Sequence, residues 1–262
     1  MSESLIGPSD PTPVSEYNEA GTARVLVVCD HASRTIPRAM NQLGVEDWVL
    51  DRHVAWDIGA AAVARVLADA LDAPAILAGY SRLIVDPNRP IDDATAFAQA
   101  SDGIAIPANR NLSAEEKRRR TECFFEPYHA AISARLRTFH TQGVTPGVVA
   151  VHTYAPVLNR VARRWHVGVM WDKDPRIAVP LIARLSTLAD LCVGDNEPYS
   201  GRHPHDFTLD HHAETAGLPY VGIEVRQDLV ATDDGAHKWG SLLAEALKAI
   251  LADEDLYRPL KA

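Results

Sequence analysis

The chain has 262 residues, of which 47% are hydrophobic and 23% charged, and its formal net charge is -9. This length allows one large α/β domain with a substantial core, and no apolar run is long enough to span a bilayer as a helix. The negative charge argues against a general nucleic-acid-binding protein, because that role needs a basic face to neutralise phosphates.

Residues 1–22 are rich in proline, serine and glycine. This composition predicts an N-terminal arm laid over the surface, followed by a single domain over residues 23–262 without a linker. The arm lacks the basic stretch and apolar core of a secretory signal, so we expect a soluble protein in the cytoplasm that has no membrane partner.

The elements of the domain are predicted from hydrophobic patterns. Short, β-branched apolar runs indicate buried strands, and apolar residues at three- and four-residue spacing indicate helices. In chain order we predict a strand at 24–29, a helix at 57–71, strands at 75–78 and 83–86, a helix from 113 to about 140, strands at 148–151 and 165–170, helices at 180–191 and 208–217, a strand at 220–225 and a helix at about 235–251. The alternation predicts a three-layer α/β/α fold with a mixed, largely parallel sheet.

Polar residues follow or end three of the predicted strands. His31 follows the first strand, His152 follows the strand at 148–151, and Glu224 lies near the end of the strand at 220–225. In open α/β sheets the reacting groups gather at the carboxyl ends of strands. Glu224 has apolar neighbours, and desolvation would raise its pKa towards the range of a general base. The alternative is an ion pair with Arg226 that only ties the strand end.

A metal site in this chain would need histidine and carboxylate ligands, because the three cysteines lie far apart without a CxxC pair. Two histidines and a carboxylate are the minimum set for a catalytic zinc ion with an open position for water. We predict His31, His152 and Asp57 as these ligands, with Asp51 and His53 as alternatives to Asp57. A structural role for the histidines is the other interpretation.

Arginines near the third predicted strand indicate how a substrate could be recognised. Arg82 lies just before that strand, and Asn88 and Arg89 follow it between two prolines. The planar guanidinium group binds two carboxylate oxygens at once, so this pattern predicts an anionic small molecule as the ligand. Surface salt bridges are the alternative.

Four histidines occur in a loop and the helix that follows it, at positions 203, 205, 211 and 212. We expect them to line the substrate entrance rather than to bind a second metal, because His211 and His212 are adjacent on a helix and cannot face one ion together. The chain has no GxSxG elbow, P-loop or strand-linked GxGxxG motif. The sequence therefore gives no motif-based reason to assign the chain to the serine hydrolases, the nucleotide hydrolases or the dinucleotide-dependent enzymes.

Six ordered segments together resemble the N-formylglutamate amidohydrolase family. They are CDHAS at 29–33, DRHVAWDIGA at 51–60, SRLIVDPNRP at 81–90, VHTYAPV at 151–157, TLDHHAE at 208–214 and IEVRQDL at 223–229. The resemblance runs from about Val25 to Trp239, and the six motifs in order are more specific than any one of them. It implies a fold like that of the zinc carboxypeptidases and the aspartoacylase group, with one zinc ion per chain at the carboxyl edge of the sheet.

The resemblance also implies roles in the chemistry. His31, Asp57 and His152 would hold the zinc ion, Glu224 would be the general base, and Arg82 or the zinc would stabilise the oxyanion. The implied reaction is metal-assisted hydrolysis of an amide in a small anionic N-acyl amino acid, N-formyl-L-glutamate first among them.

The same resemblance implies how the substrate is held. Asn88 and Arg89 would grip its α-carboxylate, and Arg226 or Arg202 would be available for a second carboxylate. Two other functions stay open. One is the same chemistry on another N-acyl amino acid or a peptide-like amide, and the other is a non-catalytic anion-binding protein that has lost the metal.

One departure concerns the acidic metal ligand. Carboxypeptidase-like sites take it from the motif of the first histidine, as in HxxE, whereas Ser33 and Arg34 follow His31 here. The carboxylate must therefore come from elsewhere in the chain, with Asp57 favoured over Asp51. The sequence leaves the oligomeric state open.

Overall fold

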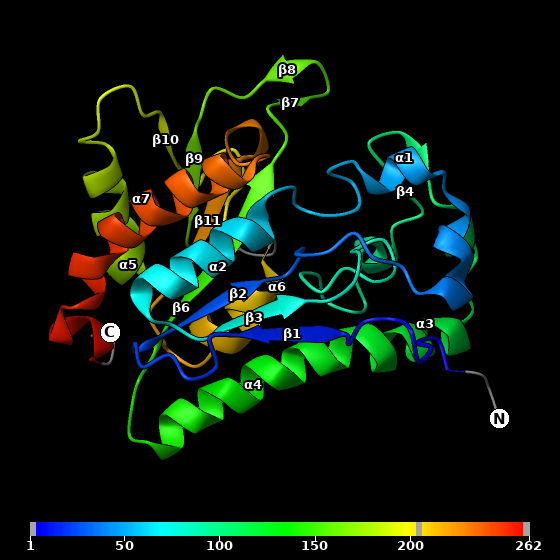
Figure 1. Cartoon of the computed structure of the whole chain (residues 1–262), viewed down its shortest axis with the longest axis horizontal. Helices are drawn as coiled ribbons and strands as arrows, with labels where there is room; N and C mark the ends of the chain where they lie inside the picture. Colours follow the sequence, from blue (N-terminus) through cyan, green and yellow to red (C-terminus); the bar gives the residue numbers. More distant parts are fainter. Residues whose placement is uncertain (1–3, 203–205, 259–262) are drawn as a thin grey trace.

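The computed structural model describes residues 4–202 and 206–258 (Figure 1). Within these residues seven strands form one sheet in the order β1-β3-β2-β6-β11-β9-β10. The strands are β1 (Val14–Tyr17), β2 (Val25–Cys29), β3 (Ala75–Ala78), β6 (Gly147–Tyr154), β9 (Val167–Met170), β10 (Val193–Asp195) and β11 (Tyr220–Arg226). β3, β2, β6 and β11 are parallel, whereas β1, β9 and β10 run the opposite way. The predicted mixed, largely parallel sheet is confirmed.

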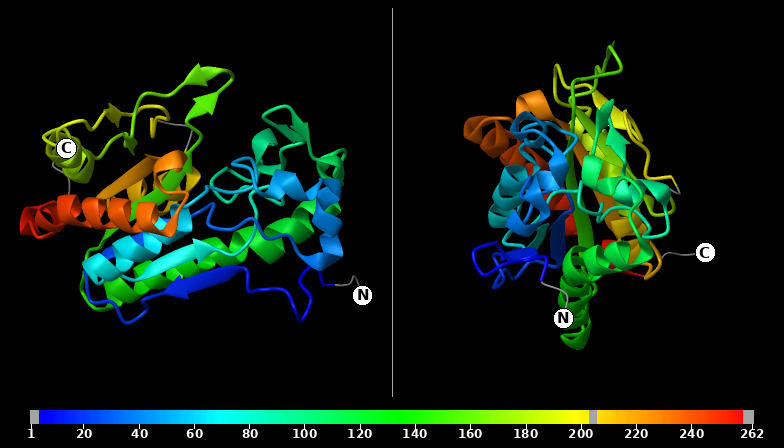
Figure 2. Two further views of the ribbon diagram at one scale, coloured as in Figure 1. Left: turned by 45° about the horizontal axis from the view of Figure 1, so that its top comes forward. Right: turned by 90° about the vertical axis from the view of Figure 1, so that its right-hand side faces the viewer.

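Helices cover both faces of this sheet (Figure 2). On one face lie α2 (Ala60–Leu71), α5 (Pro175–Leu185) and α7 (Asp233–Leu251), and on the other lies α4 (Glu126–Thr141). Because side chains alternate along a strand, Val25 and Val27 of β2 enter the first core, and Leu26 and Val28 enter the second. Each such side chain contributes about 1.5–3 kcal/mol by leaving water, which explains why the central strands are continuously apolar.

A third apolar cluster lies beyond the carboxyl edge of the sheet. It packs Leu43, Val54, Ile84, Ile106 and Phe124 together. Around it lie α1 (Asp47–Leu50), the short hairpin of β4 (Ala100–Ser101) and β5 (Ile104–Ala105), and α3 (Ala114–Arg120), on the right of Figure 1. A π-helical turn at Thr121–Phe125 joins α3 to α4, and the Ser113 side chain caps α3 by accepting a hydrogen bond from the Glu116 N–H.

The strand predicted at 83–86 is wrong. These residues form a turn inside the third cluster, where the N–H of Ile84 donates to the Ser81 carbonyl and that of Asp86 to the Ala96 carbonyl. A short apolar run is compatible with burial in any backbone conformation, so its hydrophobicity did not distinguish a strand from a buried turn.

The helix predicted at 180–191 is also displaced, because α5 begins at Pro175 and ends at Leu185. The Asp174 side chain accepts a hydrogen bond from the Arg176 N–H, and Pro175 occupies the first turn, where its missing N–H costs nothing. Pro180 lies inside the helix instead of beginning it.

Smaller elements complete the chain. The helix predicted at 208–217 is α6 (Phe207–Leu209) followed by a π-helical turn at Asp210–Glu214. The hairpin of β7 (Val157–Leu158) and β8 (Val161–Ala162) projects beyond the sheet (Figure 1). In the parts of the chain that are described, no helix has both the length and the apolar character needed to cross a membrane.

Candidate functional site

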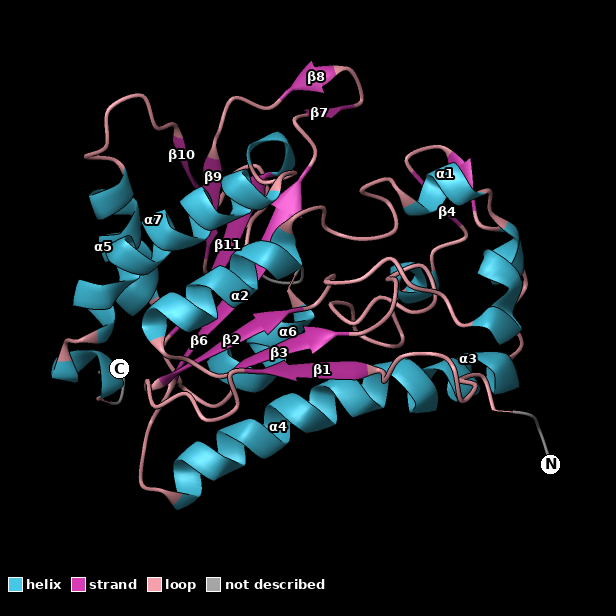
Figure 3. Cartoon of the chain, in the orientation of Figure 1, coloured by secondary structure: helices cyan, strands magenta, loops and turns pink. Residues whose placement is uncertain are grey.

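A cavity of about 440 Å³ lies at the carboxyl edge of the sheet. His31 follows β2, His152 lies near the end of β6, and Glu224 lies near the end of β11. These three strands are neighbours and parallel, so their carboxyl ends meet at one edge. Loops beyond that edge, pink in Figure 3, connect the strands to the helices. The topology therefore gathers residues from distant motifs around one cavity.

Asp57 reaches this cavity from the segment before α2. Its N–H donates to the His31 carbonyl at 3.0 Å, and its carbonyl accepts from the Ala60 N–H at 3.1 Å. Gly59 then turns the chain into α2 with a φ of 84°, and a Cβ at this position would overlap the Val230 carbonyl oxygen. Glycine is thus required here both for its positive φ and for the close approach.

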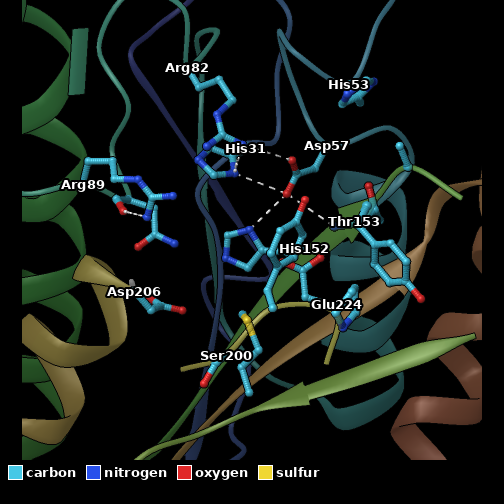
Figure 4. Close-up of a pocket in the computed structure, with 16 residues that line it drawn as sticks. His31, His53, Asp57, Arg82, Arg89, His152, Thr153, Ser200, Asp206 and Glu224 are labelled. Carbon is cyan, nitrogen blue, oxygen red and sulfur yellow. Dashed lines mark hydrogen bonds and ion pairs between the residues drawn. The ribbon is translucent and has the colours of Figure 1, made fainter. Parts of the chain in front are cut away.

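Two histidines converge on the Asp57 carboxylate (Figure 4). Its Oδ2 atom lies 3.3 Å from His31 Nδ1 and 3.0 Å from His152 Nδ1, and it also accepts the Thr153 N–H at 3.3 Å. One potential ligand atom from each of the three side chains lies within 4.8 Å of the others, and all three side chains are buried. This group could hold a metal ion.

The second nitrogen of each imidazole faces another buried carboxylate. His31 Nε2 lies 2.8 Å from Asp86 Oδ1, and His152 Nε2 lies 3.1 Å from Asp30 Oδ2. Histidines that bind metals commonly have such a carboxylate behind them, because it fixes the proton on the outer nitrogen and leaves the inner one free to coordinate. The donor set and its surroundings therefore fit a divalent cation such as zinc.

The electrostatics of the cluster also favour a cation at its centre. Burial opposes ionisation of Asp57, but His31 and His152 outweigh it and lower its pKa well below the usual range. Burial likewise opposes a charge on His152, but Asp30 and Asp57 outweigh it and raise the pKa of that imidazole. The carboxylates of Asp30, Asp57 and Asp86 surround the two imidazoles, and their negative charge favours a positive charge between them. Protons on the imidazoles or a divalent ion can supply that charge.

Glu224 lies beside this cluster with only 6% of its surface exposed. Burial is the main reason that the pKa of Glu224 is raised to about 8. His152 acts to lower this pKa, and the negative charge of Asp57 acts to raise it. Its Oε2 atom has no hydrogen-bond partner within the described part of the chain. A carboxyl group in this position can exchange a proton near neutral pH.

Three further residues predicted for the substrate line the same cavity. Arg82 donates from Nε to Asp86 Oδ2 at 2.9 Å, and its terminal nitrogen lies 3.7 Å from Asp57 Oδ1. Asn88 donates its N–H to Asp86 Oδ1 at 2.9 Å, and Arg89 donates to the Asn88 carbonyl at 3.3 Å. Asp86 therefore links the histidine cluster to the cationic wall of the cavity.

The structure places Arg226 and Arg202 elsewhere. Arg226 donates to Asp228 at 2.8 Å and to the Trp165 carbonyl at 3.3 Å, so its guanidinium ties the end of β11 to a neighbouring loop. Arg202 is exposed. Neither is among the described residues that line the cavity.

The alternative metal ligands also lie away from the cluster. Asp51 is exposed and pairs with Arg34. His53 lines the rim of the cavity and lies 3.6 Å from Asp102, apart from the cluster in Figure 4. Of the three candidates, only Asp57 meets both histidines.

The four histidines expected at the substrate entrance have different outcomes. Positions 203 and 205 lie outside the described residues. His212 is buried and bonds through Nε2 to His129 Nδ1 at 2.9 Å, while His129 Nε2 donates to the Pro87 carbonyl at 2.9 Å. His211 stacks on Phe207. Neither His211 nor His212 is among the described residues lining the cavity, and the pair of His129 and His212 instead supports the segment that carries Asn88.

Sequence reasoning gave no role to three buried aspartates of the site, Asp30, Asp86 and Asp206. Asp30 and Asp86 do lie inside the motifs that carry His31 and Asn88, so their place in the chain was a usable signal. Asp206 precedes a helix, which by itself indicates only a capping residue.

Comparisons with known proteins agree with these observations. Residues 23–231 match the family model described as N-formylglutamate amidohydrolase. The N-formylglutamate deformylase of Pseudomonas aeruginosa is 24% identical over 212 residues, which are 71% of this chain and 75% of that protein.

Two solved structures are similar over almost their whole length. A gene product from Agrobacterium tumefaciens is 33% identical with a TM-score of 0.90, covering 95% of this chain and 98% of that one. An N-formylglutamate amidohydrolase from Ralstonia eutropha JMP134 is 18% identical with a TM-score of 0.65, covering 92% and 96%. The second similarity concerns the fold alone.

Proposed function

Because the chain belongs to the N-formylglutamate amidohydrolase family, we propose that it is a metal-dependent hydrolase that cleaves the amide bond of an N-acyl amino acid. The observation that carries the proposal is the buried cluster of His31, Asp57 and His152 beside the protonatable Glu224. N-formyl-L-glutamate is the first substrate we propose, since a deformylase of that compound is a relative.

His31, Asp57 and His152 would hold one zinc ion per chain. When bound at such a site, zinc lowers the pKa of water towards neutrality and polarises the acyl carbonyl. The carboxylates of Asp86 and Asp30 would keep the outer imidazole nitrogens protonated, which directs the inner nitrogens towards the centre of the cluster.

Glu224 would move the proton in the reaction. Its carboxylate accepts a proton from the attacking water at the unpartnered Oε2 atom and passes it to the nitrogen of the leaving amine. Burial raises the pKa of this carboxyl group, which makes its ionised form a stronger base than an exposed glutamate would be.

The arginines would hold the developing and the permanent negative charges. Arg82, fixed by its hydrogen bonds to Asp86, would face the oxyanion of the tetrahedral intermediate. Arg89 and Asn88 would bind the α-carboxylate of the substrate. Arg202 and Arg226 stay predictions for a second carboxylate, and their observed positions do not support them.

The same site could accept another N-acyl amino acid or a peptide-like amide. The test compares formate or acid release from N-formyl-L-glutamate, N-acetyl-L-glutamate and N-formyl-L-leucine by zinc-loaded protein. We expect N-formyl-L-glutamate to be cleaved fastest, with activity abolished by a chelator and restored by zinc. Protein that carries metal but cleaves none of a broad set of N-acyl amino acids would contradict the proposal.

A further inference from the structure

Asp206 is a buried carboxylate in the wall of the cavity that the proposed mechanism does not use. It lies directly before α6, and only 2% of its surface is exposed. Its Oδ1 atom accepts the Leu209 N–H at 3.1 Å and so caps the helix. Its Oδ2 atom has no hydrogen-bond partner within the described part of the chain. An unpaired buried carboxylate oxygen is costly, so a hydrogen-bond donor from a ligand would relieve that cost.

The segment that carries Asp206 is hydrogen-bonded to two other parts of the site. Two residues further on, the Thr208 N–H donates to Asn88 Oδ1 at 2.9 Å, and the Thr208 hydroxyl donates to Asp30 Oδ1 at 2.6 Å. Asn88 belongs to the proposed carboxylate clamp, and Asp30 lies behind His152. Asp206 itself lines the cavity, and its carboxyl group points into it (Figure 4). Asp206 therefore faces the cavity from a segment that contacts both the clamp, through Asn88, and Asp30 behind His152.

An N-acyl amino acid bound in this cavity would extend from the clamp to the histidine cluster. Its carboxylate would lie at Asn88 and Arg89 and its acyl carbonyl at the histidine cluster, so the amide nitrogen would come between them. The N–H of that amide is the donor on this stretch of the substrate. An ionised carboxylate offers only acceptors, which makes it a matched partner for this group.

We propose that Asp206 Oδ2 accepts a hydrogen bond from the amide N–H of the substrate and thereby makes the enzyme prefer secondary amides to N-alkylated ones. This inference rests on the proposed function and adds a specificity residue to it. Burial raises the pKa of Asp206 to about 6, with an opposing effect of His152, so the carboxylate is still largely ionised at pH 7.5.

The test compares N-formyl-L-glutamate with N-formyl-N-methyl-L-glutamate, which lacks the N–H. Two variants keep a side-chain acceptor that can cap the helix but lack the Oδ2 acceptor. Asp206→Ser retains one acceptor for the Leu209 N–H, and Asp206→Asn places an amide NH2 group where Oδ2 lies. Asp253→Asn, which alters a capping aspartate at the C-terminal Glu254–Tyr257 turn, is the matched control.

We expect wild type to prefer the secondary amide by about tenfold or more in kcat/KM, the effect of one hydrogen bond to a charged group. Both Asp206 variants should lose about tenfold on the secondary amide and little on the N-methyl amide, so that the preference disappears. The control variant should keep the wild-type preference.

Other results overturn the inference. An equal loss on both substrates in the Asp206 variants would show that the residue acts only through the fold. A wild type that cleaves both amides equally well would refute the role of Asp206 while leaving the proposed function standing. A metal-loaded wild type that cleaves neither amide, nor other N-acyl amino acids, would refute both.

Discussion

Glu224 lies directly opposite His152 in the register of the parallel strands β11 and β6. Partners in register present their side chains on the same face, which brings the proton acceptor beside a candidate metal ligand. Val221 and Ile223 hold this register because they are completely buried in the core under α7. If the register slipped by one residue, the Glu224 side chain would point to the opposite face of the sheet and place its carboxyl group in that apolar core.

Glu224→Gln tests the role of this carboxylate. We expect kcat to fall by about 10²- to 10⁴-fold, because the amide cannot accept the proton of the attacking water. KM and metal content should change little, since glutamine has nearly the same size and shape. Steady-state kinetics on the best substrate of the screen, together with elemental analysis, give the answer. A variant with near-wild-type kcat would exclude Glu224 as the base.

Arg89→Lys is expected to raise KM by about tenfold or more, because lysine keeps the charge but loses the planar fork that binds two carboxylate oxygens. Arg226→Lys is the matched control, since Arg226 lies outside the cavity lining and bonds to Asp228. Its KM should stay close to that of wild type. The reverse ranking of the two variants would move the carboxylate site to Arg226.

Asp30→Asn removes the negative charge behind His152. Loss of such a partner commonly weakens metal binding by about 10- to 100-fold, because the imidazole becomes less basic and less well oriented. Competition with a chromophoric chelator measures this affinity. Asp206→Asn changes a buried aspartate that lines the cavity and is not paired with a ligand histidine, and it should bind metal like wild type. Equal affinities in all three proteins would remove Asp30 from the metal site.

The buried pair of His129 and His212 should make stability depend on pH. Burial lowers the pKa of His129 to about 4 and that of His212 to about 3, from an ordinary value of 6.5. The unfolded chain therefore binds these protons below about pH 6.5 while the folded chain does not, so the free energy of unfolding falls as the pH drops from 6.5 towards 4.

His212→Gln removes one of these titrating groups and keeps an amide that can donate to His129. Between pH 7.5 and 5, we expect wild type to lose about 2 kcal/mol more unfolding free energy than the variant does. Urea unfolding at the two pH values measures the difference. Parallel losses in the two proteins would show that His212 is not held neutral by the fold.

Much of the central architecture was predictable from the sequence, for a physical reason. β2, β6 and β11 are buried on both faces, so their apolar runs are continuous and bounded by polar residues. The edge strands were not found. β1 lies in the proline-rich segment predicted as an arm and pairs antiparallel with β3, while β10 has three residues. A short edge strand is held by backbone hydrogen bonds to a single neighbouring strand. It can therefore form without a recognisable hydrophobic pattern in its sequence.

The candidate site divides in the same way. His31 and His152 were identifiable because they lie at strand ends, and the structure brings them together with Asp57. Their roles as ligands stay predictions. Asp206 could not be assigned, since its relation to the cavity depends on hydrogen bonds from Thr208 to Asn88 and Asp30, 120 and 178 residues away in the chain. The sequence contains no periodic signal for such contacts.

The most direct test is elemental analysis of protein purified without chelators, comparing wild type with His152→Ala and with Glu224→Gln as a control that keeps all three proposed ligands. We predict about one zinc ion per chain in wild type and in Glu224→Gln, and its loss in His152→Ala. Wild-type protein without metal, and without activity after zinc is added, would contradict the metallohydrolase account and leave an anion-binding protein as the better description.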